Sequence, residues 1–138
     1  GLWRSAHAFG VAYIFCIVPR FHPIHRRQAS DTTHAAANVP YYCYSTFEEF
    51  LAARPRGAAL IAVEQAPNAR PLETFVHPRC VIYLLGAEDT GIPENILQRC
   101  NNVIAINTPV CLNVATAGSI VLYDREAKSF AAKKHIAA

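Results

Sequence analysis

The chain has 138 residues, of which 52% are hydrophobic and 17% are charged, with a formal net charge of +3. This composition excludes a disordered or highly charged tail protein, and no apolar run reaches the roughly 18 residues that would span a bilayer, so no membrane partner is expected. The small positive charge neither identifies nor opposes a nucleic-acid ligand. One domain with a single hydrophobic core, residues 1–138, is the expected organisation.

Cysteine usage and the chain start give two further expectations. The five cysteines are an odd number, scattered without any CxxC pair. This pattern favours reduced, buried thiols and therefore a cytoplasmic protein. The sequence begins without Met, inside what reads as a helix, so we expect that an extreme N-terminal segment is missing.

The first predicted elements are a helix and a strand. Residues 1–9 have helical periodicity, and Gly10 is typical of the position just after a helix. Residues 11–18 are β-branched and aromatic and end at Pro19, which is typical of a strand buried on both faces. Such strands indicate a parallel sheet.

A basic segment follows this strand. Its positive residues can neutralise phosphates without reading a base sequence, so we interpret it as an RNA-binding surface, with a merely solvated surface as the alternative. The residues concerned are Arg20, Arg26, Arg27 and His34. His22 and His25 are three residues apart, but no cysteine or carboxylate pattern accompanies them, so no metal site is expected. Residues 27–37 predict a helix.

The middle of the chain predicts a strand, a capped helix and another strand. Residues 41–45 predict a short strand. Thr46 begins a helix in which Glu49, at the third helical position, makes a capping box. Residues 58–65 then predict a third buried strand, and a proline-rich loop leads on from it.

The remaining elements continue the alternation of strand and helix. Residues 80–85 predict a fourth strand, residues 92–99 a short helix and residues 101–107 a fifth strand. Residues 113–130 predict a long helix that the alanine-rich tail can extend. We therefore expect an α/β fold with a mostly parallel sheet flanked by helices.

Two loops after the fourth and fifth strands have the composition of a ligand site. The first, GAEDTG at 86–91, lacks the GxGxxG and GxxxxGK[ST] spacings, so neither a dinucleotide nor a triphosphate is favoured. Its glycines permit close backbone approach, and Glu88 and Asp89 favour a cationic or hydroxyl-rich ligand; a plain tight turn is the alternative. The second, NTPVCLN, ends at Asn113, where a helix begins. Loops at the carboxyl ends of parallel strands commonly form ligand sites.

These loops closely resemble the motifs of the SpoU, or TrmH-like, branch of the SPOUT RNA methyltransferases. That family has a strand followed by G-x-E-x-x-G, and here the three positions are Gly86, Glu88 and Gly91. A later S-L-N-V and L-Y-[ED] motif matches CLNV from Cys111 and LYD ending at Asp124. The opening LWRSAHAFGV is similar to the family's R-[ST]-A-x-A-F-G-V run, with Arg4 as its arginine.

The resemblance implies a fold and a cofactor. SPOUT domains have a parallel sheet with a deep C-terminal trefoil knot, a feature that is otherwise rare. The loops of the knot hold S-adenosylmethionine, mostly through backbone groups. The implied cofactor-binding residues are Ala62, Val63, Glu64, Leu85, Gly86, Ile106, Thr108 and Leu112.

The resemblance also implies methyl transfer to a ribose 2'-hydroxyl of tRNA or rRNA. Arg4 carries over as the catalytic residue beside that hydroxyl, where it stabilises the developing alkoxide or helps remove the proton. Glu88 orients Arg4 or the ribose, and Asn113 shapes the substrate pocket, unless each makes only a structural hydrogen bond. Cys111 replaces the usual serine and is a weaker hydrogen-bonding group; no covalent role is expected for it.

Two functions therefore stay open. The first is an RNA 2'-O-methyltransferase; the second is a knotted RNA-binding protein that has lost catalysis, favoured by Cys111 and by the absence of an asparagine that precedes the first motif. The resemblance further implies a homodimer through the knot region. Its expected apolar seam consists of Trp3, Phe9, Val121 and Phe130, which would be core in a monomer.

Overall fold

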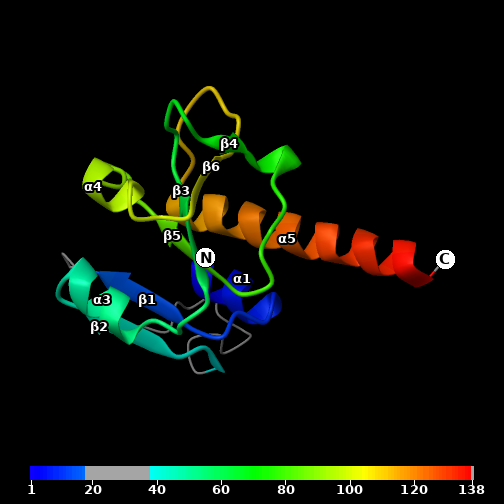
Figure 1. Ribbon diagram of the computed structural model, residues 1–138, viewed down its shortest axis with the longest axis horizontal. Helices are drawn as coiled ribbons and strands as arrows, with labels where there is room; N and C mark the ends of the chain where they lie inside the picture. The colour runs from blue at the N-terminus through cyan, green and yellow to red at the C-terminus, as the bar shows by residue number, and fades with distance from the viewer. Residues whose placement is uncertain (18–37, 138) are drawn as a thin grey trace. The chain divides into compact units, whose positions relative to one another are not determined.

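The computed structural model describes residues 1–17 and 38–137, which fall into two compact units, Gly1–Pro55 and Arg56–Ala138 (Figure 1). Each unit is described by itself. The predicted helix over 27–37 and the four basic residues of the predicted RNA-binding surface lie outside the described residues. That the whole chain forms one domain stays a prediction.

The first unit begins with helix α1, Leu2–Ala8, whose C-cap Phe9 is followed by Gly10, the predicted stop. The Val11 N–H bonds to the Ala6 carbonyl at 2.9 Å and the Gly10 N–H to the His7 carbonyl at 3.2 Å. This pair of bonds is a Schellman motif, and it requires the left-handed backbone that Gly10 adopts at φ +67°. A glycine is therefore needed at this helix end.

Two short parallel strands and a helix complete this unit. They are β1 (Ile14–Ile17), β2 (Tyr41–Tyr44) and α3 (Phe47–Ala53), with Cys16 and Cys43 as register partners across the two strands. The Thr46 hydroxyl caps α3 by accepting the Glu49 N–H at 3.1 Å, as predicted. The Glu49 carboxylate reaches one residue further back than a capping box, to the Ser45 N–H at 2.9 Å. Phe50 of α3 is fully buried and stacks on Phe15 of β1 at 4.4 Å between ring centroids.

The second unit is a parallel sheet with a long helix against it (Figure 1). Its elements are β3 (Ala59–Val63), β4 (Arg70–Pro71), the 3-10 helix η1 (Leu72–Thr74), β5 (Val81–Leu85), α4 (Glu94–Leu97), β6 (Asn102–Ala105) and α5 (Val114–Ala137). The strand order is β4-β6-β3-β5, and each pair is parallel. The predicted fold class, mostly parallel strands flanked by helices, is confirmed. The implied knot is not visible in the described residues and stays a prediction.

The prediction of a plain loop between β3 and β5 is wrong, because this segment holds β4 and η1. Arg70 pairs with Ile104 and Pro71 with Ala105 at the edge of the sheet. Proline is tolerated on an edge strand because it has no N–H to give to a further neighbour. The pairing is with a strand more than thirty residues later in the chain, so local sequence does not reveal it.

The core lies between the sheet and α5. Ile61 of β3, Ile104 of β6 and Val121 of α5 are fully buried, and Leu72 and Phe75 pack with them. Val121 is therefore core and unavailable to a subunit seam, contrary to its place in the predicted dimer surface.

Side chains of α5 also bind the carbonyls of the segment that follows β4. The Arg125 guanidinium donates to the Pro78 and Arg79 carbonyls at 2.6 and 2.7 Å. The Lys128 ammonium donates to the Leu72 and Phe75 carbonyls at 2.6 and 2.9 Å. These charge-assisted bonds satisfy backbone oxygens that no strand pairs, and they fix α5 along the sheet.

His77 lies at the centre of this contact. Its Nδ1 is 2.6 Å from the Tyr83 hydroxyl, and its Nε2 is 2.7 Å from Asp124 Oδ2, which also meets Lys128 Nζ at 2.7 Å. A neutral imidazole with its proton on Nε2 satisfies both bonds, accepting from Tyr83 and donating to Asp124. Burial lowers the pKa of His77 despite the opposing effect of Asp124, so the ring is neutral at pH 7.

This arrangement predicts a loss of stability in mild acid. The folded pKa of His77 lies below the unfolded value of about 6.5, so its contribution is present above that pH and is lost as the pH falls toward the folded pKa. We expect the urea midpoint to fall between pH 7.5 and pH 5.5, and to fall less in His77→Gln. His7→Gln, at an exposed position of α1, is the control and should behave as the native chain does. An equal fall in all three proteins would contradict the assignment.

The cysteines correct one expectation. None of the five is in a disulfide, but none is buried either, and Cys43, Cys80 and Cys111 are exposed. Cys43 lies on an exposed face of a two-stranded sheet. Cys80 and Cys111 lie in loops, where apolar neighbours in the sequence do not ensure that a side chain is buried.

Among the described helices, none combines the length and apolar character needed to cross a membrane.

Candidate functional site

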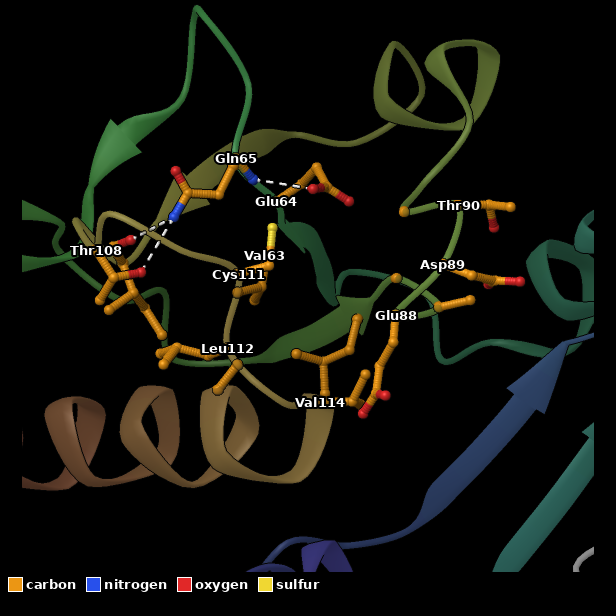
Figure 2. A pocket seen from close by; sticks show the side chains of 16 residues that line it. Val63, Glu64, Gln65, Glu88, Asp89, Thr90, Thr108, Cys111, Leu112 and Val114 are labelled. Atoms are coloured by element: carbon orange, nitrogen blue, oxygen red, sulfur yellow. Dashed lines mark hydrogen bonds between the residues drawn. The ribbon is translucent and has the colours of Figure 1, made fainter.

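An open cavity of about 300 Å³ lies in the second unit, at the carboxyl ends of β3, β5 and β6 (Figure 2). Its walls are the ends of these strands, the loop 86–91 and the stretch from Ile106 to the first turns of α5. The predicted cofactor residues that line it are Val63, Glu64, Leu85, Gly86, Ile106, Thr108 and Leu112.

Ala62 is the exception among the predicted cofactor residues. It does not line the cavity and is fully buried in the sheet. Side chains alternate between the two faces of a strand, so Ala62 and Val63 point to opposite sides. The predicted cofactor contacts are mostly through backbone groups, so a cofactor-binding role for Ala62 stays a prediction.

The loop 86–91 is folded tightly on itself. The Gly91 N–H donates to the Ala87 carbonyl at 2.8 Å, and Gly91 has a left-handed backbone with φ +66°. A Cβ on Gly86 would lie 2.8 Å from the carbonyl carbon of Gly91. Gly86 is thus required by its close approach to Gly91, and Gly91 by its left-handed backbone, which explains the spacing G-x-E-x-x-G in physical terms.

The side chain of Glu64 lies against this loop. One carboxylate oxygen accepts the Ile92 N–H at 2.8 Å, and the other accepts the Gln65 N–H at 3.0 Å. The Glu64 backbone N–H donates to the Ile104 carbonyl at 3.0 Å. Glu64 therefore joins the end of β3 to the residue that follows the loop.

Gln65 is a lining residue that sequence reasoning missed. Its side-chain nitrogen donates to the Ile106 carbonyl at 2.8 Å and lies 3.4 Å from the Thr108 hydroxyl (Figure 2). The Thr108 hydroxyl in turn donates to the Val110 carbonyl at 2.8 Å. These bonds fix the second loop beside the end of β3. The sequence feature that indicates Gln65 as a site residue is its polar side chain just beyond the end of a buried parallel strand.

Glu88 and Asn113 are brought together by the two loops. The Asn113 amide nitrogen donates to Glu88 Oε1 at 2.8 Å, and its oxygen accepts the Ala115 and Thr116 N–H groups at 2.9 and 3.4 Å. Figure 2 shows Glu88 extending toward Val114 at the start of α5, whereas Asp89 and Thr90 point away from it. Glu88 lines the cavity and Asn113 does not. Both side chains thus make a structural hydrogen bond, and their predicted catalytic roles stay predictions.

The other predicted site residues lie elsewhere. Arg4 is exposed on α1 of the first unit, and its catalytic role stays a prediction. Cys111 is exposed and lines the cavity. Across residues 1–17 and 38–137, histidine, cysteine and carboxylate side chains form no cluster of three or more that could hold a metal ion.

The cap made by Asn113 predicts a measurable difference between two substitutions. Asn113→Ala removes both the cap of α5 and the bond to Glu88, and should lower the free energy of unfolding by about 1–2 kcal/mol. Asn113→Asp keeps the capping oxygen but places a second carboxylate beside Glu88, so Glu88→Gln should restore stability to Asn113→Asp and not to Asn113→Ala. Urea titration of the two Asn113 variants, each with and without Glu88→Gln, measures these differences in the free energy of unfolding. No restoration by Glu88→Gln would contradict the pairing.

The described fold is similar to several solved structures. An AdoMet-bound rRNA methyltransferase from Sinorhizobium meliloti has a TM-score of 0.80 at 20% identity, covering 92% of this chain and 50% of that one. The SpoU methyltransferase AviRb from Streptomyces viridochromogenes, in complex with AdoMet, has a TM-score of 0.78 at 18% identity, covering 94% and 52%. A structure concerned with the 2-OH methylation of C/U34 on tRNA has a TM-score of 0.75 at 23% identity, covering 94% and 81%.

These likenesses establish the fold, and the chain spans about half the length of the first two structures. No curated protein matches the sequence. The model of the SpoU rRNA Methylase family, in contrast, matches residues 1–123, which include both loops of the cavity and α1. The chain therefore belongs to the SpoU rRNA methylase family.

Proposed function

We propose that the protein is an S-adenosylmethionine-dependent RNA methyltransferase that acts on a ribose 2'-hydroxyl of tRNA or rRNA. The observation that carries this proposal is the cavity between the loop 86–91 and the stretch 106–112, in a chain of the SpoU family. Two similar structures contain AdoMet, and a third concerns 2-OH methylation on tRNA. These similarities support the proposal.

The cavity residues suit the proposed cofactor. The volume of the cavity, about 300 Å³, is at the lower end of the roughly 300–1,000 Å³ typical of small-molecule sites. Leu85, Ile106 and Leu112 offer apolar surface to an adenine ring. The acidic side chains of Glu88 and Asp89 favour the positive charge of a sulfonium group.

S-adenosylmethionine supplies a methyl group bonded to a positively charged sulfur. The protein must place the ribose oxygen in line with that methyl group and stabilise the negative charge that develops as the hydroxyl proton leaves. We assign this second task to Arg4. Because an arginine side chain stays protonated in proteins, Arg4 acts through its charge, and water accepts the proton.

The remaining parts of the proposal concern location and partners. RNA would bind through Arg20, Arg26, Arg27 and His34, which are outside the described residues, and the protein would act in the cytoplasm. A homodimer would form through α5, on which Phe130, Tyr123 and Ile120 are 69%, 64% and 36% exposed. These three side chains share one helical face and replace the buried Val121 in the proposed seam. Trp3, on α1, and Phe9, which follows α1, are half-buried.

Binding of S-adenosylhomocysteine, the product of the proposed cofactor, tests the enzyme directly. We expect titration calorimetry of the full-length protein to show one site per chain. Absence of binding would contradict the methyltransferase and favour the second candidate, an RNA-binding protein that has lost catalysis.

Substitution of Arg4 tests the catalytic step. Arg4→Ala should lower the methylation rate by about 100-fold, because one charge-stabilising group is lost, while the affinity for S-adenosylhomocysteine stays unchanged. Arg4→Lys keeps the positive charge and should retain part of the rate. Arg56→Ala, at an exposed position, is the control. An unchanged rate in Arg4→Ala would remove Arg4 from this role.

The proposed seam on α5 can be tested by its charge tolerance. Tyr123→Glu combined with Phe130→Glu should convert a dimer into a monomer in sedimentation equilibrium, because like charges would be placed on a buried apolar face. Val76→Glu replaces an apolar residue that is 85% exposed outside α5, and should leave the assembly unchanged. A native protein that is monomeric at all concentrations would contradict the seam.

A further inference from the structure

Both carboxylate oxygens of Glu64 accept hydrogen bonds from backbone groups of its own unit. Its two oxygens accept the N–H groups of Ile92 and Gln65, one each. Backbone donors bond more strongly to a charged carboxylate than to a neutral acceptor. Although Glu64 lines the cavity, its charged atoms are thus directed at the protein chain.

The same carboxylate fills the space next to both glycines of the loop 86–91. A Cβ on Gly91 would lie 2.7 Å from Glu64 Oε2 and 3.2 Å from its Cδ, and its third nearest neighbour is also a Glu64 atom. A Cβ on Gly86 would lie 2.9 Å from Glu64 Oε2. At separations below 3.0 Å one of the two groups must shift, so a side chain at either glycine would displace the Glu64 carboxylate from its present hydrogen bonds.

The contact between Glu64 and the loop 86–91 lies at the wall of the cavity. Residues 86–91 all line the cavity, and the bond from Ile92 to Glu64 lies directly after them. Before the loop, Leu85 pairs with Val63, the last residue of β3. The loop is therefore attached at both ends to the same strand end, by sheet pairing on one side and by the Glu64 side chain on the other.

We propose that Glu64 is a positioning residue whose carboxylate holds the loop 86–91 against the end of β3 and so fixes one wall of the cavity. The part of this inference that concerns cofactor affinity rests on the proposed function. The part that concerns the loop does not.

A double-mutant cycle tests the loop. In the native background, Gly91→Ala should lower the urea midpoint strongly, because the new methyl group meets the Glu64 carboxylate and the backbone has φ +66°. In the Glu64→Ala background the same substitution should lower the midpoint much less, because only the backbone strain remains. Equal losses in the two backgrounds would overturn the proposal.

Gly57→Ala is the matched control for this cycle. Gly57 has φ +85° and no atom within 4 Å of a built Cβ, so its substitution introduces backbone strain without a steric clash. Its cost should be the same with and without Glu64→Ala. A cost that changed with the background would show that Glu64→Ala alters the chain generally, and would overturn the local reading.

Two further measurements connect the loop to the cavity. In Glu64→Ala, amide hydrogen exchange at Ile92 should be faster by about tenfold or more, and the Kd for S-adenosylhomocysteine should rise by about tenfold. Glu64→Gln keeps one acceptor oxygen and should be intermediate in both, while Glu73→Ala, at an exposed position of η1, should change neither.

The outcomes separate the two proposals. If the native protein does not bind S-adenosylhomocysteine, the proposed function fails, and the cycle and the Ile92 exchange still decide the role of Glu64. If the native protein binds and Glu64→Ala binds equally well, the role of Glu64 in fixing the cavity wall is overturned. Unchanged exchange at Ile92 would overturn the attachment of the loop.

Discussion

The parallel pairing of β3 with both of its neighbours is the constraint on which the site depends. Val63 of β3 pairs with Leu85 of β5 on one side and with Ile104 of β6 on the other, so the three strands end at the same edge of the sheet. Parallel strands always bring their carboxyl ends together, and the loops that follow them must then share one space. The core of Ile61, Ile104 and Val121 holds this register, because a shift by one residue would reverse the side-chain faces.

Helix α5 supports this arrangement at its start and in its middle. Its first turn lines the cavity, and its middle is held by Asp124, Arg125 and Lys128 against the segment between β4 and β5. The side chain of His77 joins this contact as a neutral ring, because one ring nitrogen accepts from the Tyr83 hydroxyl and the other donates to Asp124. Polar networks whose hydrogen bonds are satisfied make the packing more rigid and favour one arrangement of the helix.

Local chemistry explains which features the sequence predicts well. The stop at Gly10 and the cap at Thr46 depend on neighbouring residues only, and both are found. Strand β4 and the Glu64 contact depend on partners far along the chain, and the sequence reveals neither. Motif position predicts the strand ends and loops that line the cavity, but it does not predict which side chains of a strand face it: Val63 lines the cavity and Ala62 is buried in the sheet.

The amide of Asn113 contacts a cavity-lining residue with one atom and the backbone of α5 with another. Its oxygen is bound to the first turn of α5 and its nitrogen to Glu88, so two different atoms serve the helix and the loop. If Glu88 turned toward another partner, the amide nitrogen would lose one bond while the cap stayed in place. The Glu88 side chain can therefore change its partner without unwinding the helix that Asn113 caps.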